Sequence, residues 1–479
     1  MTNEPIHSLS IGKTPLGTVM KLALPAIIEQ LVLTLMTYVD TAMVGRDVQG
    51  LVSTAAIGVC SSTIWFINGA LSAVAIGLAV QVAHRCGAND TAGARDVIAQ
   101  AVLCIPVVGC FFALVMLGLS FGVPVWMNAT EDIIVPAGWY MRILGFAMPF
   151  GLSVSLFSAV LRNTGDMKTP MICNIAANLV NVVLNYFLIY PTHTVTLFGS
   201  EYTVVGAGLG VIGAAVATAL SQMTAGIALF SRVMFRRSPL RPGKDTKFRF
   251  RRDILLAAAR LGLPVFLQRA CISGGQIAIT GMISSLHSNV ALSANSLAIT
   301  AEGISYLPAD GFAEAAGALV GQSMGANRPD LAKKFGKLTL ILGVCSMFVT
   351  GTLLFVFSDR LISLFIEDAD VIALGGRMLR IVAASEPFFA ASIVLTGVFR
   401  GADDTKFGMI LGIVCMWGIR IVAAYFLVPR FGLAGAWYGM VMDLVARGIL
   451  CAIHFFRGRF LRAYRPLPPT EEKTAFEES

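Results

Sequence analysis

Asp40 is an acidic residue in a segment otherwise suited to lipid, because it directly follows the apolar stretch 31–39. Apolar surroundings disfavour the charged form of a carboxyl group, so such a residue can take up a proton. If the segment begins near residue 16, Asp40 lies about 36 Å along the helix axis, in the outer half of the membrane. The alternative is a helix-end acid that only reaches the interface, and position alone supports both interpretations equally.

Four asparagines, Asn174, Asn178, Asn181 and Asn185, follow one another at steps of four, three and four residues. This spacing places all four amides on one face of a helix. The stripe either lines a polar cavity or bonds neighbouring helices together, which is the usual role of amides in membranes. The equivalent helix of a second, repeated half lacks the stripe, which favours a special role in the first half.

Further ionisable residues lie within apolar segments of the C-terminal part of the chain. They are Arg269, Glu302, Asp310, Glu314, Glu386, Arg420 and Asp443. Charged groups are costly in lipid, so each is a candidate for function. Glu302 and Glu386 are candidate polar residues of a transport cavity. An internal ion pair from Arg269 to Glu302 or Glu314 is expected, and a structural role is favoured for most of the set.

The sequence lacks the patterns of an enzyme, an ATP-driven pump or a metal centre. Gly12-Lys13-Thr14 does not form a phosphate-binding loop, because His7 stands where the first glycine is needed and no strand precedes it. The five histidines lie far apart without an HExxH motif, and none of the nine cysteines forms a CxxC pair. No cofactor and no metal are therefore expected, and any transport should draw on an ion gradient.

The composition is that of a helical membrane protein. Of 479 residues, 56% are hydrophobic and only 13% are charged, against about 25% charged in soluble domains. Segments 102–125, 211–230 and 338–357 carry no charge, and about 20 apolar residues suffice to cross a bilayer as a helix. In lipid a helix also satisfies its own backbone groups.

Apolar runs and the breaks between them predict an all-α membrane protein with twelve transmembrane helices. The predicted spans are 16–44, 51–83, 94–120, 133–160, 168–190, 207–234, 254–284, 292–322, 333–357, 370–398, 406–428 and 433–456. The corresponding division is an N-terminal tail 1–15, a six-helix lobe 16–234, a basic linker 235–253, a second six-helix lobe 254–456 and a tail 457–479.

The basic residues predict the orientation of these spans. They gather in segment 235–252, in the loop after the eighth span and in the tail, whereas loops 121–132 and 191–206 contain no Lys or Arg. The positive-inside rule then places both termini and the linker in the cytoplasm, with the protein in the inner or plasma membrane. A basic linker can bind nucleic acid or anionic lipid, but a topological anchor is the favoured interpretation, and no nucleic-acid partner is expected.

The two halves of the chain are copies of each other. Gly87-Ala-Asn recurs as Gly325-Ala-Asn, and the segment that begins at Arg142 recurs at Arg380, both displaced by 238 residues. With six spans in each copy, the lobes should be related by a pseudo-two-fold axis along the membrane normal. Two such bundles can rock against each other about a shared cavity, which is the geometry of alternating access. The repeat therefore favours a transporter.

Several short motifs resemble those of the multidrug and toxic compound extrusion (MATE) transporters. Leu22-Ala-Leu-Pro25 followed by Val39-Asp40-Thr41-Ala-x-Val-Gly45 resembles the first helix of that family. Leu319-Val-Gly-Gln322 and the turn from Arg400 to Lys406 resemble its second-half motifs. The similarity covers the whole chain, and it is closer to the bacterial branch that carries an aspartate on helix one.

The resemblance implies a V-shaped pair of six-helix lobes that exports cationic or amphiphilic compounds in exchange for protons or sodium. It implies that Asp40 is the protonation or cation site, that Pro25 marks a bend, and that Asn181, Asn185 and Thr218 are partners of the aspartate. Some relatives carry a second aspartate at position 185. The acids of another branch, on helices seven and ten, are not clearly matched, so ion coupling is expected in the N-terminal lobe.

The predicted partners are a small-molecule substrate, H⁺ or Na⁺ and membrane lipid, with the protein acting as a monomer. The first alternative is a lipid-linked sugar or lipid flippase of the same repeat architecture, whose cavity should be ringed by arginines. The first half offers mainly Arg142 and Arg162, which recur in the second half and are interpreted as structural. A membrane-embedded enzyme is less favoured, because no cluster of His, Asp or Ser is visible.

Overall fold

The computed structural model describes residues 14–47, 50–127, 129–197, 200–235, 239–243, 246 and 248–465. Within these ranges the chain is helical apart from one hairpin of two strands. The predicted helical fold class is therefore confirmed, with one local exception. Most of the two predicted tails lies outside the described residues, as do four basic residues of the linker, Arg236, Arg237, Lys244 and Lys247.

The first bundle consists of six long helices, each of which overlaps one predicted span. They are α1 (Pro15–Gly45), α2 (Gly50–Gly87), α3 (Thr91–Trp126), α4 (Glu131–Asn163), α5 (Lys168–Ile189) and α6 (Gly210–Phe235). Helix α4 packs against α2, α3 and α6 and so forms the centre of the bundle. Met141, Leu152 and Phe157 of this helix are fully buried, which places the apolar core of the lobe around it.

The second bundle contains the remaining helices and follows the same order of crossings. Its helices are α7 (Arg252–Ser284), α8 (Asn289–Ser305), α9 (Leu307–Gly325), α10 (Pro329–Val356), α11 (Ser358–Ser363), α12 (Ala369–Ala383), α13 (Glu386–Gly401), α14 (Thr405–Ile413), α15 (Val422–Phe431) and α16 (Leu433–Phe456). A π-helical segment, Val414–Ile421, joins α14 to α15, and a 3₁₀ turn, Arg459–Arg462, follows α16.

Two predicted spans of the second half are broken rather than continuous. The span at 292–322 divides at Tyr306 into α8 and α9, and Pro308 stands in the first turn of α9. The span at 370–398 bends by 60° between α12 and α13, where Pro387 stands in the first turn of α13. Proline fits a first helical turn but cannot continue a helix from the preceding turn, which accounts for both breaks.

The number of membrane-crossing helices agrees with this arrangement. In the described part of the chain, ten helices are long and apolar enough to cross a membrane, or eleven when α12 and α13 are taken as one bent span. Helices α8 and α9 together occupy the remaining predicted position, although each is short by itself. The order of the helices therefore follows the twelve predicted spans.

A β-hairpin lies where the first half carries its extra segment, and the sequence analysis did not predict it. Strands β1 (Pro191–Leu197) and β2 (Ser200–Ala207) are antiparallel, with Pro191 opposite Ala207 and Leu197 opposite Ser200. Both strands are rich in threonine, valine and tyrosine, which favour extended backbone. The hairpin joins α5 to α6 without disturbing the register of the repeat on either side.

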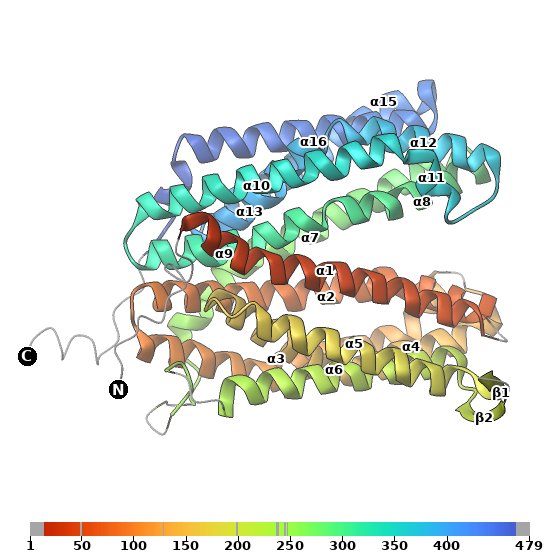
Figure 1. Ribbon diagram of the computed structural model, residues 1–479, viewed down its shortest axis with the longest axis horizontal. Coiled ribbons are helices and arrows are strands. Elements are labelled where there is room, and N and C mark those ends of the chain that lie inside the picture. The colour runs from red at the N-terminus through yellow and green to blue at the C-terminus, as the bar shows by residue number, and fades with distance from the viewer. Residues whose placement is uncertain are drawn as a thin grey trace, which may run out of the picture.

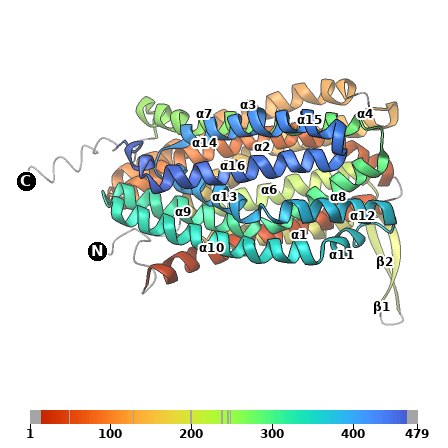
Figure 2. The same ribbon diagram turned by 90° about the horizontal axis from the view of Figure 1, so that it is seen from above.

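The two bundles lie side by side as separate lobes (Figure 1). Both chain ends lie at one end of the molecule, and the hairpin lies at the other (Figures 1 and 2). We call these the termini end and the hairpin end. The ribbons of the lobes meet toward the termini end and diverge toward the hairpin end (Figure 1).

Helices α2 and α9 hold the lobes together at the termini end, and we call this contact the α2–α9 crossing. A Cβ atom on Gly87 of α2 would lie 2.0 Å from the backbone oxygen of Gln322. A Cβ atom on Gly325 of α9 would lie 2.0 Å from the backbone oxygen of His84. The two glycines are equivalent in the repeat, as are His84 and Gln322, so one close approach is made twice.

The same crossing carries two equivalent contacts from side chain to backbone. Nε2 of Gln322 donates to the carbonyl oxygen of Asn163 at 2.6 Å, and Nε2 of His84 lies 2.8 Å from the carbonyl oxygen of Gly401. Asn163 and Gly401 end α4 and α13, so their carbonyl groups have no acceptor role within their own helices. Each lobe thus supplies a partner to a helix end of the other lobe.

We predict that Gly87→Ala and Gly325→Ala each lower the free energy of unfolding by about 1–3 kcal/mol, because the added methyl group meets backbone rather than a movable side chain. Thermal unfolding in detergent measures the change. Gly281→Ala is the matched control, since nothing lies within 4 Å of its Cβ position. Equal unfolding midpoints for Gly325→Ala and Gly281→Ala would show that the helices do not cross as closely as described.

Candidate functional site

Asp40 lies in the hairpin-end half of α1, five residues before the helix ends at Gly45. Nδ2 of Asn185 donates to its Oδ1 at 2.8 Å. Asn181 satisfies both ends of its amide when its nitrogen faces Asp40, where it donates to Oδ1 and Oδ2 at 2.8 and 3.0 Å. In that orientation its oxygen accepts from the backbone N–H of Thr218 at 3.1 Å. The structure therefore brings together four predicted site residues from α1, α5 and α6.

The amide partners suit a carboxyl group that changes its protonation state. An ionised carboxylate only accepts hydrogen bonds, whereas a protonated one also donates. An amide offers both a donor and an acceptor, so Asn181 can serve either form by turning its side chain over. Oδ1 of Asn185 is buried and has no hydrogen-bond partner among the described residues, which leaves a second acceptor beside Asp40. The site can thus hold a proton or present several oxygens to a cation.

A polar cavity within the first lobe opens onto this site. It has an empty volume of about 490 Å³, solvent-connected space included, and Asp40 lines it together with Asn174, Asn178 and Asn181. The remaining lining comes mainly from α6, including Thr218, Ser221 and Gln222. Three members of the predicted asparagine stripe therefore face the same space as the aspartate.

The asparagine stripe also bonds helices together, so its two predicted roles are not exclusive. Nδ2 of Asn174 donates to Oε1 of Glu29 on α1 at 2.6 Å, and Nδ2 of Asn178 donates to the backbone oxygen of Asn174 at 2.8 Å. Asn185 and Asn174 thus contact α1 at two places, Asp40 and Glu29. The stripe fastens α5 to α1 along the wall of the cavity.

Glu29 is a site residue that the sequence analysis missed. Its side chain is buried and forms an ion pair with Arg162 of α4 at 2.7 Å. It stands eleven residues before Asp40, or about three helical turns, so the two acids share one face of α1. An acid inside an apolar run was the signal that could have identified it. Arg162, which was interpreted as structural, is the partner of this acid.

Pro25 lies within α1 one helical turn before Glu29. Proline removes a backbone hydrogen bond and crowds the preceding turn, which weakens a helix at that point. Helix α1 is nevertheless a single helix in this structure. Its buried residues cluster between Thr18 and Glu29, and residues 30–43 are half-buried or exposed. The helix is therefore firmly packed around the proline and loosely packed beyond it.

Glu302 and Glu386 lie in the second lobe, away from the Asp40 cluster. Glu386 accepts from the hydroxyl group of Ser305 at 2.9 Å, and its Oε1 is buried without a hydrogen-bond partner among the described residues. Glu302 is also buried, and Arg420 is the nearby charge that acts on it. Both acids are enclosed by protein, and neither lines the cavity beside Asp40.

The predicted ion pair from Arg269 to Glu302 or Glu314 is wrong. Glu314 is instead paired with Arg400 at 3.4 Å, and Arg269 forms no ion pair with any described residue. Spacing along a helix predicts which residues share a face, but which face meets which neighbour depends on how each helix is rotated. The pairing therefore could not be derived from the sequence.

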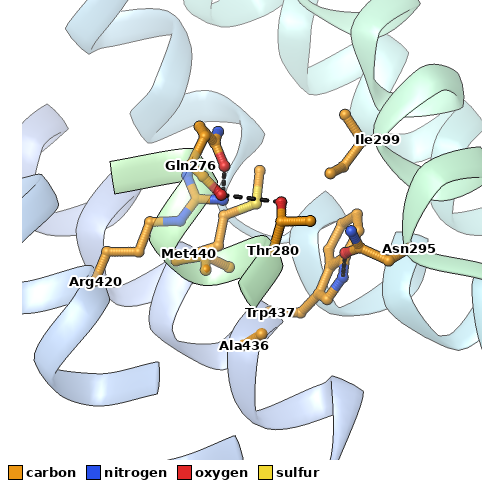
Figure 3. A pocket seen from close by; sticks show the side chains of 9 residues that line it. Gln276, Thr280, Asn295, Ile299, Arg420, Ala436, Trp437 and Met440 are labelled. Carbon is orange, nitrogen blue, oxygen red and sulfur yellow. Dashed lines mark hydrogen bonds between the residues drawn. The ribbon is translucent and has the colours of Figure 1, made fainter. Parts of the chain in front are cut away.

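A small pocket in the second lobe surrounds Arg420 (Figure 3). Its empty volume is about 270 Å³, and the guanidinium group contacts Oε1 of Gln276 at 3.5 Å. Nε1 of Trp437 donates to Oδ1 of Asn295 at 3.0 Å on the opposite side (Figure 3). The pocket is lined by a cation and an aromatic ring, in contrast to the acid and amides of the first lobe.

The comparisons with known proteins decide the family. A family model described as MatE matches residues 25–187 and 264–426, one range in each half of the repeat. The chain belongs to the MATE family. It is 27% identical to the probable multidrug resistance protein NorM of Thermotoga maritima, over 92% of each chain. It is 24% identical to the multidrug resistance protein PmpM of Pseudomonas aeruginosa, over 99% of each chain.

Solved structures agree with this fold. One is described as the outward-facing conformation of a multidrug resistance MATE family transporter of the MOP superfamily. It matches 97% of this chain and all of its own with a TM-score of 0.86 and 20% identity. Membership of the MATE family makes the chain a multi-pass efflux antiporter rather than an enzyme, which confirms the predicted function at this level.

In this MATE protein, the pair between Glu29 and Arg162 should contribute strongly to stability. We predict that Glu29→Gln lowers the free energy of unfolding by about 3–5 kcal/mol, because it leaves Arg162 buried without an anion. Replacing both residues, as Glu29→Gln with Arg162→Met, should cost less than the sum of the single changes. Thermal unfolding of all four proteins measures this coupling, and strictly additive losses would show that the pair is not formed.

Proposed function

We propose that Asp40 is the coupling site of this antiporter and that protons moving inward drive the export of cationic or amphiphilic organic compounds. The observation that carries the proposal is the cluster around Asp40. It is a lone carboxyl group at the edge of a polar cavity, and its partners Asn181, Asn185 and Thr218 are all neutral. With one negative charge and no fixed positive charge beside it, the cavity attracts either a cationic compound or a proton.

The proposed orientation places both termini in the cytoplasm of a cell whose inner or plasma membrane holds the protein. The start of α7 carries Arg249, Arg251 and Arg252, and the start of α10 carries Lys333 and Lys334. The starts of α7 and α10 and the end of α16 lie at the termini end (Figure 1). The positive-inside rule supports this end as the cytoplasmic one. The α2–α9 crossing then closes the cytoplasmic side, and the structure corresponds to the outward-facing state.

The proposed cycle follows from competition between proton and substrate for one carboxylate. The ionised Asp40 accompanies a bound compound to the outward-facing state. A proton from outside then neutralises Asp40, which removes the attraction for a cationic compound and releases it. Protonation also changes the hydrogen bonds to Asn181 and Asn185, so α1 can bend near Pro25. Return to the inward-facing state delivers the proton to the cytoplasm.

The lipid flippase is a second candidate, and the arginines of the first lobe weigh against it. Arg142 lies over the rings of Phe121 and Trp139 at 4.3 and 5.0 Å, and Arg162 is paired with Glu29. Both cations are therefore engaged within the protein and do not line the cavity beside Asp40. An anionic lipid headgroup would lack basic partners there.

We predict that Asp40→Asn abolishes efflux driven by a pH gradient, because the amide cannot bind and release a proton. Everted membrane vesicles loaded with a fluorescent cationic dye provide the measurement. Asp40→Glu should keep part of the activity, and Asp132→Asn, which removes an acid at the start of α4, should leave it unchanged. Wild-type efflux by Asp40→Asn would exclude Asp40 as the coupling site.

A second prediction separates protons from sodium. We expect that Asn185→Asp confers stimulation of efflux by a sodium gradient, because a second carboxylate beside Asp40 raises the affinity of oxygen ligands for a hard cation. Asn178→Asp is the matched control, since this residue lines the same cavity without a hydrogen bond to Asp40. If the wild-type protein already responds to sodium alone, sodium rather than the proton is the coupling ion.

A further inference from the structure

Arg269 is a cation in the membrane interior without a direct anionic partner. It lies seventeen residues after the start of α7 at Arg252, or about 25 Å along the helix axis. Asp310 and Glu314 are close enough to act on its charge, but neither forms an ion pair with it. Glu314 is occupied by Arg400, which adds a second positive charge to the surroundings of Arg269. An arginine at this depth is costly and is a functional candidate by default.

The side chain of Arg269 lines a cavity between the two lobes. The cavity has an empty volume of about 560 Å³, and its walls come from α2 of the first lobe and α7 of the second. Trp65, Phe66 and Phe266 supply aromatic surface, and the rings of Phe66 and Phe266 meet edge to face with centroids 5.4 Å apart. Opposite the arginine stem, Gly69 leaves room, because a Cβ atom there would lie 3.7 Å from Cδ of Arg269.

This combination of groups defines the chemistry of a ligand. Aromatic walls bind a planar ring system through apolar contact and ring stacking. A guanidinium group pairs with a carboxylate through two parallel hydrogen bonds, a geometry that an ammonium group cannot provide. Asp310, which likewise lacks an ion pair among the described residues, places an acid within electrostatic range of the arginine. A ligand with a carboxylate and a separate cationic centre satisfies both charges.

We infer that the cavity between α2 and α7 binds planar aromatic substrates and that Arg269 holds their carboxylate group. The inference rests on the proposed export function, since it assigns a substrate class to the space between the lobes. It extends that function from cationic compounds to zwitterionic ones. Because Phe66 and Phe266 belong to different lobes, the cavity has this shape only while the lobes keep their present relation. Substrate bound at Arg269 is therefore sensitive to the conformational change that moves the lobes.

The test compares two dyes that differ only in the acidic group. One is a rhodamine with a free benzoate carboxyl group, and the other is its methyl ester, which is a simple cation. Binding of each to the purified protein in lipid nanodiscs is measured by fluorescence anisotropy. We expect Arg269→Gln to weaken binding of the free acid by about tenfold or more, as for a lost hydrogen bond to a charged group. Binding of the ester should change by less than about twofold, because no charge-assisted bond is lost.

Two further variants exclude a general loss of folding. Arg269→Lys keeps the charge without the planar fork, so it should weaken binding of the acid less than Arg269→Gln does. Arg430→Gln removes a cation from the exposed surface of α15 and should change neither affinity. Equal losses for both dyes in Arg269→Gln, or no binding of the free acid to the wild-type protein, would overturn the assignment.

Failure of this inference differs from failure of the proposed function. If a pH gradient drives no efflux but the acid and ester still separate at Arg269, the coupling proposal fails and the binding site stands. If efflux depends on Asp40 but Arg269→Gln treats both dyes alike, the binding site fails and the coupling proposal stands.

Discussion

The α2–α9 crossing is the constraint on which the rest of the structure depends. Two helical bundles in lipid gain little from apolar contact with each other, because lipid tails are as apolar as their surfaces. Close backbone approach and interhelical hydrogen bonds must therefore hold them. Here two glycines allow that approach, and His84 and Gln322 bond to helix ends of the opposite lobe. With one end fastened in this way, the lobes can diverge at the other end and leave space for the cavities.

The duplicated chain uses one scaffold for two different kinds of chemistry. Positions that hold the lobes together have kept equivalent roles, as His84 and Gln322 show, although one is an imidazole and the other an amide. Positions that face the cavities have diverged. The first lobe presents Asp40 and neutral amides, whereas the second presents Arg420 with Trp437. Repetition thus accounts for the architecture, and departure from repetition marks the functional surfaces.

Much of the fold could be predicted from the sequence because a lipid environment leaves few choices. Long apolar runs had to become helices, and the displacement of 238 residues gave the pairing of the halves. The grouping of Asp40 with Asn181, Asn185 and Thr218 was implied by family resemblance, and the structure places these side chains within hydrogen-bond reach. Glu29 could have been found by the same rule that identified Asp40.

Other features depend on interactions that a linear pattern does not contain. The hairpin at 191–207 lies outside the repeated unit, so no equivalent segment gave a guide to it. The breaks at Tyr306 and before Glu386 interrupt segments whose composition remains apolar. The partner of Arg269 was predicted wrongly because the rotation of α7 against α9 is set by packing. Periodicity along a helix does not determine that rotation.

Helix α1 connects these observations, because its two acids have opposite surroundings. Glu29 is buried and joined to Arg162 and Asn174, so the part of α1 near Pro25 is anchored to α4 and α5. Asp40 is held only by neutral amides at the edge of a cavity, and no residue between 30 and 43 is fully buried. A change in the charge of Asp40 can therefore move the loosely packed half of the helix while the anchored half stays in place. Pro25 and Glu29 lie one turn apart, so any bend should begin where the anchoring ends, and the proton signal would be converted into movement over only three helical turns.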